Sequence, residues 1–212
     1  MPPKRILVLG ATGGTGQEVV LQALEQGHAV TAFARRPDRM RGSHERLRFV
    51  AGDVTQAGGA LAEAVRGQDA VISALGQGLK LRSDDLISRS TPRIVEAMER
   101  EAVSRLIVTS AFGVGDTWRD VPPLARILVR VFLHDLYADK ELGERTLRRS
   151  PLDWTLVYPT MLTSGPRTGR SRAGERLALR GLPRISRADV AAFLLAQLDD
   201  RTYVRKGVLL SD

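Results

Sequence analysis

The chain has 212 residues, of which 43% are hydrophobic and 26% charged, and it carries a formal net charge of +8. This composition is ordinary for a globular protein with a sizeable core, and the absence of cysteine excludes disulfides, thiolate metal sites and thiol nucleophiles. No apolar run is long enough to cross a bilayer, and the residues after Met1 do not resemble a signal peptide. We therefore expect a cytoplasmic protein with no membrane partner.

The predicted elements alternate between strands and helices along the whole chain. The apolar pattern predicts strands at 6–9, 28–34, 47–51, 70–75, 105–110, 154–158 and 208–210. The helical pattern predicts helices after the first strand and at 55–66, 90–101, 122–149 and 186–198. Strands that are apolar on both faces and separated by helices predict an α/β fold with a doubly wound parallel sheet. We expect residues 1–212 to form one such domain.

Local signals refine these elements. Thr55 and Ser186 are expected to be helix N-caps, and Pro92 is expected in the first turn of its helix. Residues 111–121 are expected to form a loop. Residues 163–187, rich in arginine, glycine, serine and proline, are expected to form a loop or lid on the substrate side, with a short hairpin.

The first predicted strand leads directly into Gly10-Ala11-Thr12-Gly13-Gly14-Thr15-Gly16. A strand, a glycine turn and a helix form the phosphate-binding start of a dinucleotide fold, in which backbone N–H groups approach a pyrophosphate. A P-loop would need a lysine and a hydroxyl residue after its last glycine, where this chain has Gln17-Glu18. The turn therefore indicates a dinucleotide rather than ATP with magnesium.

The end of the second predicted strand indicates which dinucleotide. An acidic residue here would favour NAD, but the chain has Ala34-Arg35-Arg36, followed by Arg39. Guanidinium groups bind phosphate with paired donors, so this position favours NADP over NAD. The alternative is a solvated basic turn. The positive charge lacks the interleaved aromatic residues of a base-stacking surface, so we do not expect nucleic acid as a partner.

These motifs occur in one order with several others downstream, namely Gly52-Asp53-Val54, Asp69-Ala70-Val71-Ile72, Thr109-Ser110-Ala111-Phe112 and Asp153-Trp154-Thr155-Leu156-Val157-Tyr158-Pro159. In this the chain resembles the atypical short-chain dehydrogenase/reductase family of NAD(P)H-binding proteins. Within that family it is most similar to the biliverdin-IXβ reductase and flavin reductase group. The resemblance implies a Rossmann-type fold over essentially the whole chain and NADP(H) as the cofactor.

The resemblance also implies which residues contact the cofactor. The glycine turn would hold the pyrophosphate, arginines the 2′-phosphate, Asp53 and Val54 the adenine, and the ends of later strands the nicotinamide. The implied residues are Gly10, Thr12, Gly13, Gly14, Thr15, Gly16, Arg35, Arg36, Arg39, Asp53, Val54, Leu75, Gly76, Ser110, Tyr158, Pro159, Thr160 and Met161. For Asp53 the alternative is a helix cap.

The chain departs from the family's usual catalytic pattern. Orthodox members use Tyr-x-x-x-Lys, but Tyr137 and Lys140 are only three residues apart, which places them about 300° apart on a helix. Lys140 fits the position of the family's lysine, whereas Tyr137 is expected in the core or at the surface. Ser110 is the candidate for orienting the acceptor, and the proton can come from solvent. His134 is a weaker candidate for proton donor.

Together these features predict an NADPH-dependent reductase that transfers hydride to a planar conjugated acceptor: a flavin, a biliverdin-like tetrapyrrole or a quinone. The alternative is a non-catalytic NADP(H)-binding regulatory or assembly protein, which the incomplete dyad favours. A sugar-nucleotide epimerase would need the full dyad and a larger C-terminal domain. The arginines of 163–187 either attract an anionic acceptor or are solvated. We expect no metal site, and either a monomer or a homodimer.

Overall fold

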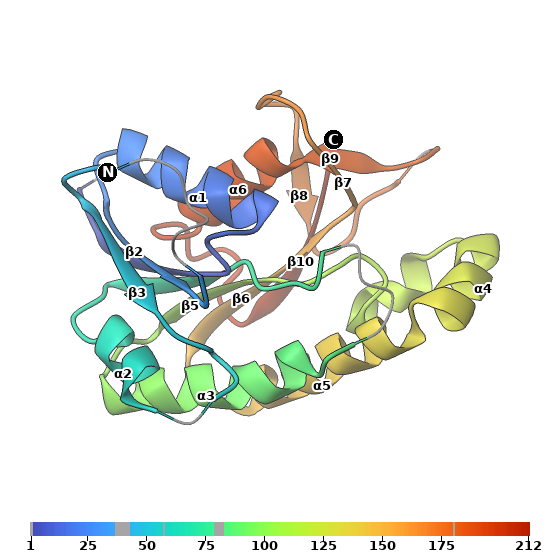
Figure 1. Ribbon diagram of the computed structural model, residues 1–212. Helices are drawn as coiled ribbons and strands as arrows, with labels where there is room; N and C mark the ends of the chain where they lie inside the picture. The colour runs from blue at the N-terminus through green and yellow to red at the C-terminus, as the bar shows by residue number, and fades with distance from the viewer. Residues whose placement is uncertain (1, 37–42, 57, 79–82, 180) are drawn as a thin grey trace.

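The computed structural model describes residues 2–36, 43–56, 58–78, 83–179 and 181–212 (Figure 1). Its main sheet has eight strands in the order β3-β2-β1-β4-β5-β6-β10-β8. These strands are β1 (Arg5–Leu9), β2 (Ala29–Ala34), β3 (Leu47–Ala51), β4 (Ala70–Ser73), β5 (Arg105–Thr109), β6 (Asp153–Pro159), β10 (Lys206–Ser211) and β8 (Arg172–Gly174). All neighbours pair in parallel except β8, which pairs antiparallel with β10. The predicted doubly wound Rossmann-type fold is confirmed.

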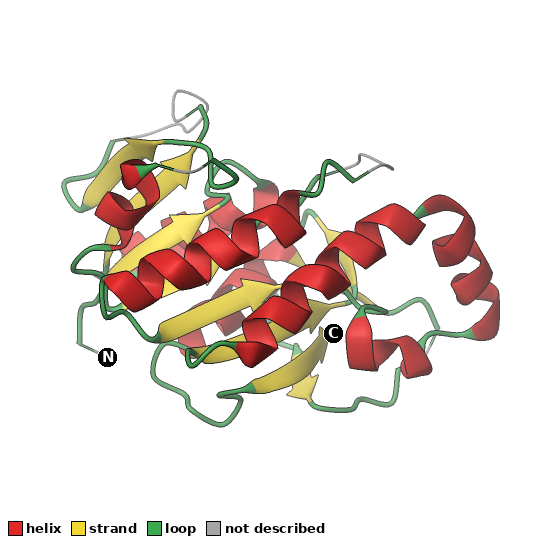
Figure 2. Ribbon diagram, turned by 90° about the horizontal axis from the view of Figure 1, so that it is seen from below, coloured by secondary structure: helices red, strands yellow, loops and turns green. Residues whose placement is uncertain are grey.

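Helices cover both faces of the sheet because its strands are apolar on both sides. In β1, Ile6 and Val8 belong to one buried cluster, and Leu7 and Leu9 belong to the other. Helices α1 (Gly14–Glu25) and α6 (Arg187–Ala196) pack on the first face. On the opposite face lie α2 (Gly59–Val65), α3 (Leu86–Arg100) and α5 (His134–Arg149), with α3 and α5 side by side (Figures 1 and 2).

The order of the strands reverses at β1, because β2 lies on one side of it and β4 on the other. The loops that follow β1 and β4 therefore meet at the carboxyl edge of the sheet, where such folds form their ligand crevice. Contact between them is close. Gly10 has a φ of +77°, and a Cβ added to it would lie 2.7 Å from the carbonyl oxygen of Ala74. Only glycine fits here.

Two predicted helix starts are wrong. Thr55 does not cap α2, which begins at Gly59, because Thr55 instead donates to the carboxylate of Asp53 within a tight turn. Helix α3 begins at Leu86 rather than Ser90, which places Pro92 inside the helix. The earlier start is stabilised from outside, since Asp139 of α5 accepts hydrogen bonds from the backbone N–H groups of Ile87 and Ser88.

The predicted helix at 122–149 is two helices, α4 (Pro123–Phe132) and α5, separated at Leu133, whose φ is −123°. The side chains of Ile127, Val131 and Phe132 are more than half exposed. Helix α4 projects from the body of the molecule, so these apolar residues do not reach the core (Figures 1 and 2). The predicted loop before it contains a 3₁₀ helix, η2 (Gly115–Asp120).

The segment after β6 does not form the predicted hairpin. Strand β7 (Met161–Thr163) pairs in parallel with β9 (Arg184–Ser186), while β8 joins the main sheet through β10. The predicted cap of α6 is confirmed, because the Ser186 hydroxyl accepts a hydrogen bond from the backbone N–H of Asp189. In the part of the chain that the structure describes, no helix is both long and apolar enough to span a membrane.

Candidate functional site

The glycine turn between β1 and α1 is built to approach a ligand. A Cβ on Gly16 would overlap the carbonyl oxygen of Gly10 and lie 2.9 Å from the Cα of Ala11, so the turn and the helix touch backbone to backbone. The Gly13 N–H donates to the carbonyl oxygen of Gly10 at 3.0 Å and closes the turn. Gly13 is the N-cap of α1 and provides no side-chain cap. The first N–H groups of the helix are thus left for an anion.

The arginines that follow β2 lie next to this turn in the fold, because β2 is the direct neighbour of β1. Arg35 and Arg36 are exposed, and Arg39 lies outside the described residues. Hydrogen bonds from the N–H and hydroxyl of Thr55 lower the pKa of Asp53, and the charge of Arg35 contributes to the shift. Asp53 therefore stabilises a turn after β3 rather than capping α2.

The ends of β5 and β6 carry a buried polar cluster that includes a residue absent from the predicted site, Glu144 of α5. The Ser110 hydroxyl donates to Oε1 of Glu144 at 2.5 Å, and the Tyr158 hydroxyl donates to Oε2 at 2.7 Å. All three residues are less than 10% exposed. Arg148, one helical turn further on, donates to the Tyr158 hydroxyl at 3.1 Å and pairs with Asp116 at 3.2 Å.

Lys140 lies one turn before Glu144 and lines the same small cavity as Ser110 and Thr109. Burial lowers the pKa of the Lys140 ammonium, although the charges of Glu144 and Asp139 oppose this shift. Among the described residues Lys140 has no hydrogen bond or ion pair, and the buried hydroxyl of Thr109 has no partner. The structure thus brings the two predicted catalytic residues, Ser110 and Lys140, to one place.

Burial also raises the pKa of Glu144, although hydrogen bonds from Ser110 and Tyr158 and the charge of Arg148 oppose this effect. The pKa of Tyr158 is raised by burial and by the neighbouring carboxylate of Glu144. Glu144 can therefore hold a proton more readily than an exposed glutamate. The spacing of Lys140 and Glu144 by four residues indicates a shared helix face, which is the one signal in the sequence for Glu144.

Tyr137 takes no part in this cluster. Its hydroxyl donates to the carbonyl oxygen of Phe112 at 3.0 Å, and burial raises its pKa. It lines a separate pocket of about 320 Å³ between η2, α4 and α5, together with Trp118 and His134. His134 is exposed, and its Nδ1 lies 3.3 Å from Oδ1 of Asp135. Neither residue therefore lies beside Ser110.

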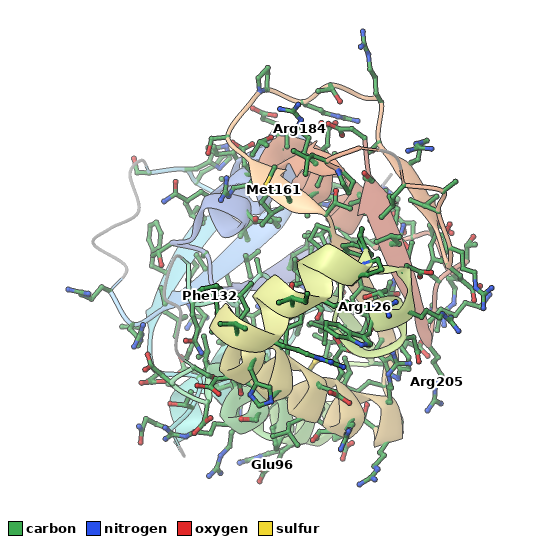
Figure 3. The ribbon with its side chains drawn as sticks, turned by 90° about the vertical axis from the view of Figure 1, so that its right-hand side faces the viewer. Glu96, Arg126, Phe132, Met161, Arg184 and Arg205 are labelled. Atoms are coloured by element: carbon green, nitrogen blue, oxygen red, sulfur yellow. The ribbon has the colours of Figure 1, made fainter. Side chains whose placement is uncertain are left out.

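The remaining predicted residues lie at the same edge of the sheet but differ in exposure. Leu75 is half-buried and Gly76 is exposed, directly after β4. The side chains of Tyr158, Pro159 and Thr160 are buried, and Tyr158 contacts the cluster through its hydrogen bond to Glu144. Met161 is 57% exposed on β7 and is free to contact a ligand (Figure 3). In the described ranges, no group of three acidic or histidine residues is placed to hold a metal ion.

Comparison with known proteins gives a match to a family model described as NAD(P)H-binding, over residues 10–201. An uncharacterized chloroplastic protein of Arabidopsis thaliana, At2g34460, is 31% identical over 175 residues. The aligned region is 78% of this chain and 62% of that protein, so the chain spans less than two thirds of this relative.

Two solved structures share the fold. ChuY from Escherichia coli O157:H7, described as an anaerobilin reductase, is 24% identical with a TM-score of 0.80, over 97% of this chain and 96% of that one. A short-chain dehydrogenase/reductase from Veillonella parvula, solved in complex with NADP, is 21% identical with a TM-score of 0.81. The match covers 99% of this chain and 94% of that one.

Proposed function

Since the chain belongs to the NAD(P)H-binding family, we propose that it is an NADPH-dependent reductase that transfers hydride to a planar conjugated acceptor. A flavin, a biliverdin-like tetrapyrrole and a quinone are the acceptor classes to test. The observation that carries the proposal is the cluster at the carboxyl edge of the sheet, in which half-buried Lys140 lines the same cavity as the buried residues Ser110 and Glu144. The likeness to ChuY supports including a tetrapyrrole among the acceptors.

The residues present fit a dinucleotide with a 2′-phosphate. The uncapped start of α1 leaves its first N–H groups for a pyrophosphate, and the turn before it touches the helix backbone at Gly16. Arg35 and Arg36 are exposed on the neighbouring strand end and offer guanidinium donors to the 2′-phosphate. When bound, the nicotinamide supplies the hydride, and the protein supplies position and electrostatics.

Ser110 has two possible roles, and the proton on Glu144 selects between them. With Glu144 ionised, the Ser110 hydroxyl donates to the carboxylate and presents only an acceptor to a ligand. With Glu144 protonated, the carboxyl group can donate to Ser110, whose own proton is then free for the reduced acceptor. Because burial raises the pKa of Glu144, this second arrangement persists to higher pH than it would with an exposed glutamate.

A turnover assay separates the reductase from a non-catalytic NADP(H)-binding protein. Purified protein is mixed with NADPH and with FMN, a quinone or biliverdin, and absorbance of the reduced nicotinamide is followed. We expect oxidation that depends on the acceptor. Tight binding of NADPH with no oxidation by any of these acceptors would contradict the reductase and support the non-catalytic alternative.

The cofactor preference is tested with Arg35→Asp. We expect NADPH to bind at least about tenfold more weakly and NADH to change much less, because only NADPH carries the 2′-phosphate. Arg93→Asp, on the exposed surface of α3, is the matched control for the change in net charge. Equal losses for the two cofactors would show that Arg35 does not contact the 2′-phosphate.

A further inference from the structure

Arg187, the first residue of α6, lies directly against the glycine turn. A Cβ added to Gly14, the first residue of α1, would have Arg187 atoms as its three nearest neighbours: Cδ at 2.8 Å, Nε at 2.9 Å and Cζ at 3.8 Å. The φ of Gly14 is not positive, so what glycine provides here is space for the Arg187 side chain and not an unusual backbone conformation. The absence of a side chain at Gly14 is what lets the arginine reach the turn.

The polypeptide around Arg187 is held in place by hydrogen bonds to the buried carboxylate of Asp189. Asp189, on the same turn of α6, accepts from the backbone N–H groups of Thr168 and Gly169 and from the Ser186 hydroxyl. Although burial opposes the shift, these hydrogen bonds together lower the pKa of Asp189, which keeps the carboxylate ionised. The start of the arginine-rich segment is therefore fastened to the start of α6.

The guanidinium of Arg187 has no carboxylate partner among the described residues. Its Nη1 donates a hydrogen bond to the neutral hydroxyl of Ser164, at 3.0 Å. Helices α1 and α6 pack together on one face of the sheet, and both begin at its carboxyl edge (Figure 1). An arginine without a countercharge thus lies at the uncapped start of α1, where the local dipole also favours an anion.

We propose that Arg187 is a cofactor-binding residue whose guanidinium binds the pyrophosphate beside the glycine turn. The proposal rests on the proposed function, in which that turn holds the pyrophosphate. Guanidinium groups bind phosphate oxygens with paired, charge-assisted hydrogen bonds, and Ser164 is an uncharged partner that Arg187 can leave. Arg187 would then act on the pyrophosphate, and Arg35 on the 2′-phosphate.

Three ligands separate these roles in a fluorescence titration: NADPH, NADH and adenosine 2′-monophosphate, which has no pyrophosphate. In Arg187→Ala we expect NADPH and NADH to bind more weakly by a similar factor of about ten or more, with adenosine 2′-monophosphate unchanged. Arg187→Lys should recover part of the loss. Arg184→Ala, an exposed neighbour on β9, is the matched control (Figure 3).

The outcomes distinguish this proposal from the one it rests on. If the wild-type protein binds neither nicotinamide dinucleotide, both proposals are overturned. If the wild-type protein binds them and Arg187→Ala binds them equally well, only the role of Arg187 is overturned. A similar loss for adenosine 2′-monophosphate would indicate a general structural defect, and would also overturn the assignment to the pyrophosphate.

A double-mutant cycle with Gly14→Ala gives a second test. The added methyl group should displace Arg187 and weaken binding of NADPH in the wild-type background. In Arg187→Ala there is no arginine to displace, so Gly14→Ala should have little further effect. Equal effects in the two backgrounds would show that the methyl group obstructs the cofactor by itself, and that the contact with Arg187 does not matter for binding.

Discussion

Glu144→Gln separates the charge of the buried carboxyl group from its shape. The Glu144 side chain is 5% exposed and accepts hydrogen bonds from the hydroxyls of Ser110 and Tyr158. Glutamine has the same length, and its amide oxygen can accept from one hydroxyl while its amide nitrogen donates to the other. The variant is therefore expected to fold with both hydroxyls paired, but without a titrating group at this position.

The size of the effect follows from linkage between protonation and folding. Burial raises the pKa of Glu144 above its ordinary value of 4.5, so the folded state holds this proton more tightly than the unfolded state. The resulting stability is fully present below the unfolded pKa and is lost as the pH rises through the folded pKa. Over this pH range the free energy of unfolding of the wild-type protein, relative to that of Glu144→Gln, should fall by about 1.4 kcal/mol for each unit that separates the folded and unfolded pKa values.

Urea unfolding of both proteins at several pH values from about 4 to 8 measures this difference. The free energy of unfolding of the wild-type protein, minus that of the variant, should fall as the pH rises. Glu141→Gln is the matched control, because Glu141 lies on the same helix in an exposed ion pair with Arg145. A difference that is independent of pH, or that increases with pH, would refute the conclusion that burial dominates at Glu144.

Two further substitutions test the turn and the segment around it. Gly16→Ala should abolish NADPH binding and destabilise the fold by about 1–3 kcal/mol, because the added Cβ meets the backbone of Gly10. Thermal melting and NADPH titration compare it with Gly165→Ala, where an added Cβ has no neighbour within 4 Å, and equal behaviour of the two variants would contradict the reasoning. Asp189→Ala should lower the free energy of unfolding by about 2 kcal/mol and speed proteolysis near Thr168, because the backbone N–H groups of Thr168 and Gly169 lose their acceptor. An unchanged cleavage rate would show that Asp189 does not hold this segment in place.

Errors in the predicted elements have a common physical cause. Helix α3 begins earlier than its own sequence indicates because Asp139, which is far away in the sequence, supplies its N-terminal hydrogen bonds. Helix α4 has an apolar stripe like that of a buried helix, but Ile127 and Val131 remain exposed. A local pattern reports which face of a helix is apolar, and it does not report what that face contacts.

The sequence predicts the glycine turn well because backbone geometry fixes the residue type there. Gly10 has a positive φ and lies against the backbone of Ala74, and only glycine meets both requirements, so the turn can be recognised from the sequence. Glu144 was missed because many residues can occupy a helix position facing a sheet. Its role exists only because β5 and β6 place Ser110 and Tyr158 opposite it.

By itself the sequence determined the alternation of strands and helices, the parallel sheet and the glycine turn, because these follow from periodicity and from backbone sterics within short stretches. Only the tertiary structure decided that Glu144 joins Ser110, that Tyr137 lies elsewhere, and that Arg187 reaches Gly14. These are contacts between segments far apart in the chain. They depend on how helices rotate and pack against the sheet, which no local pattern encodes.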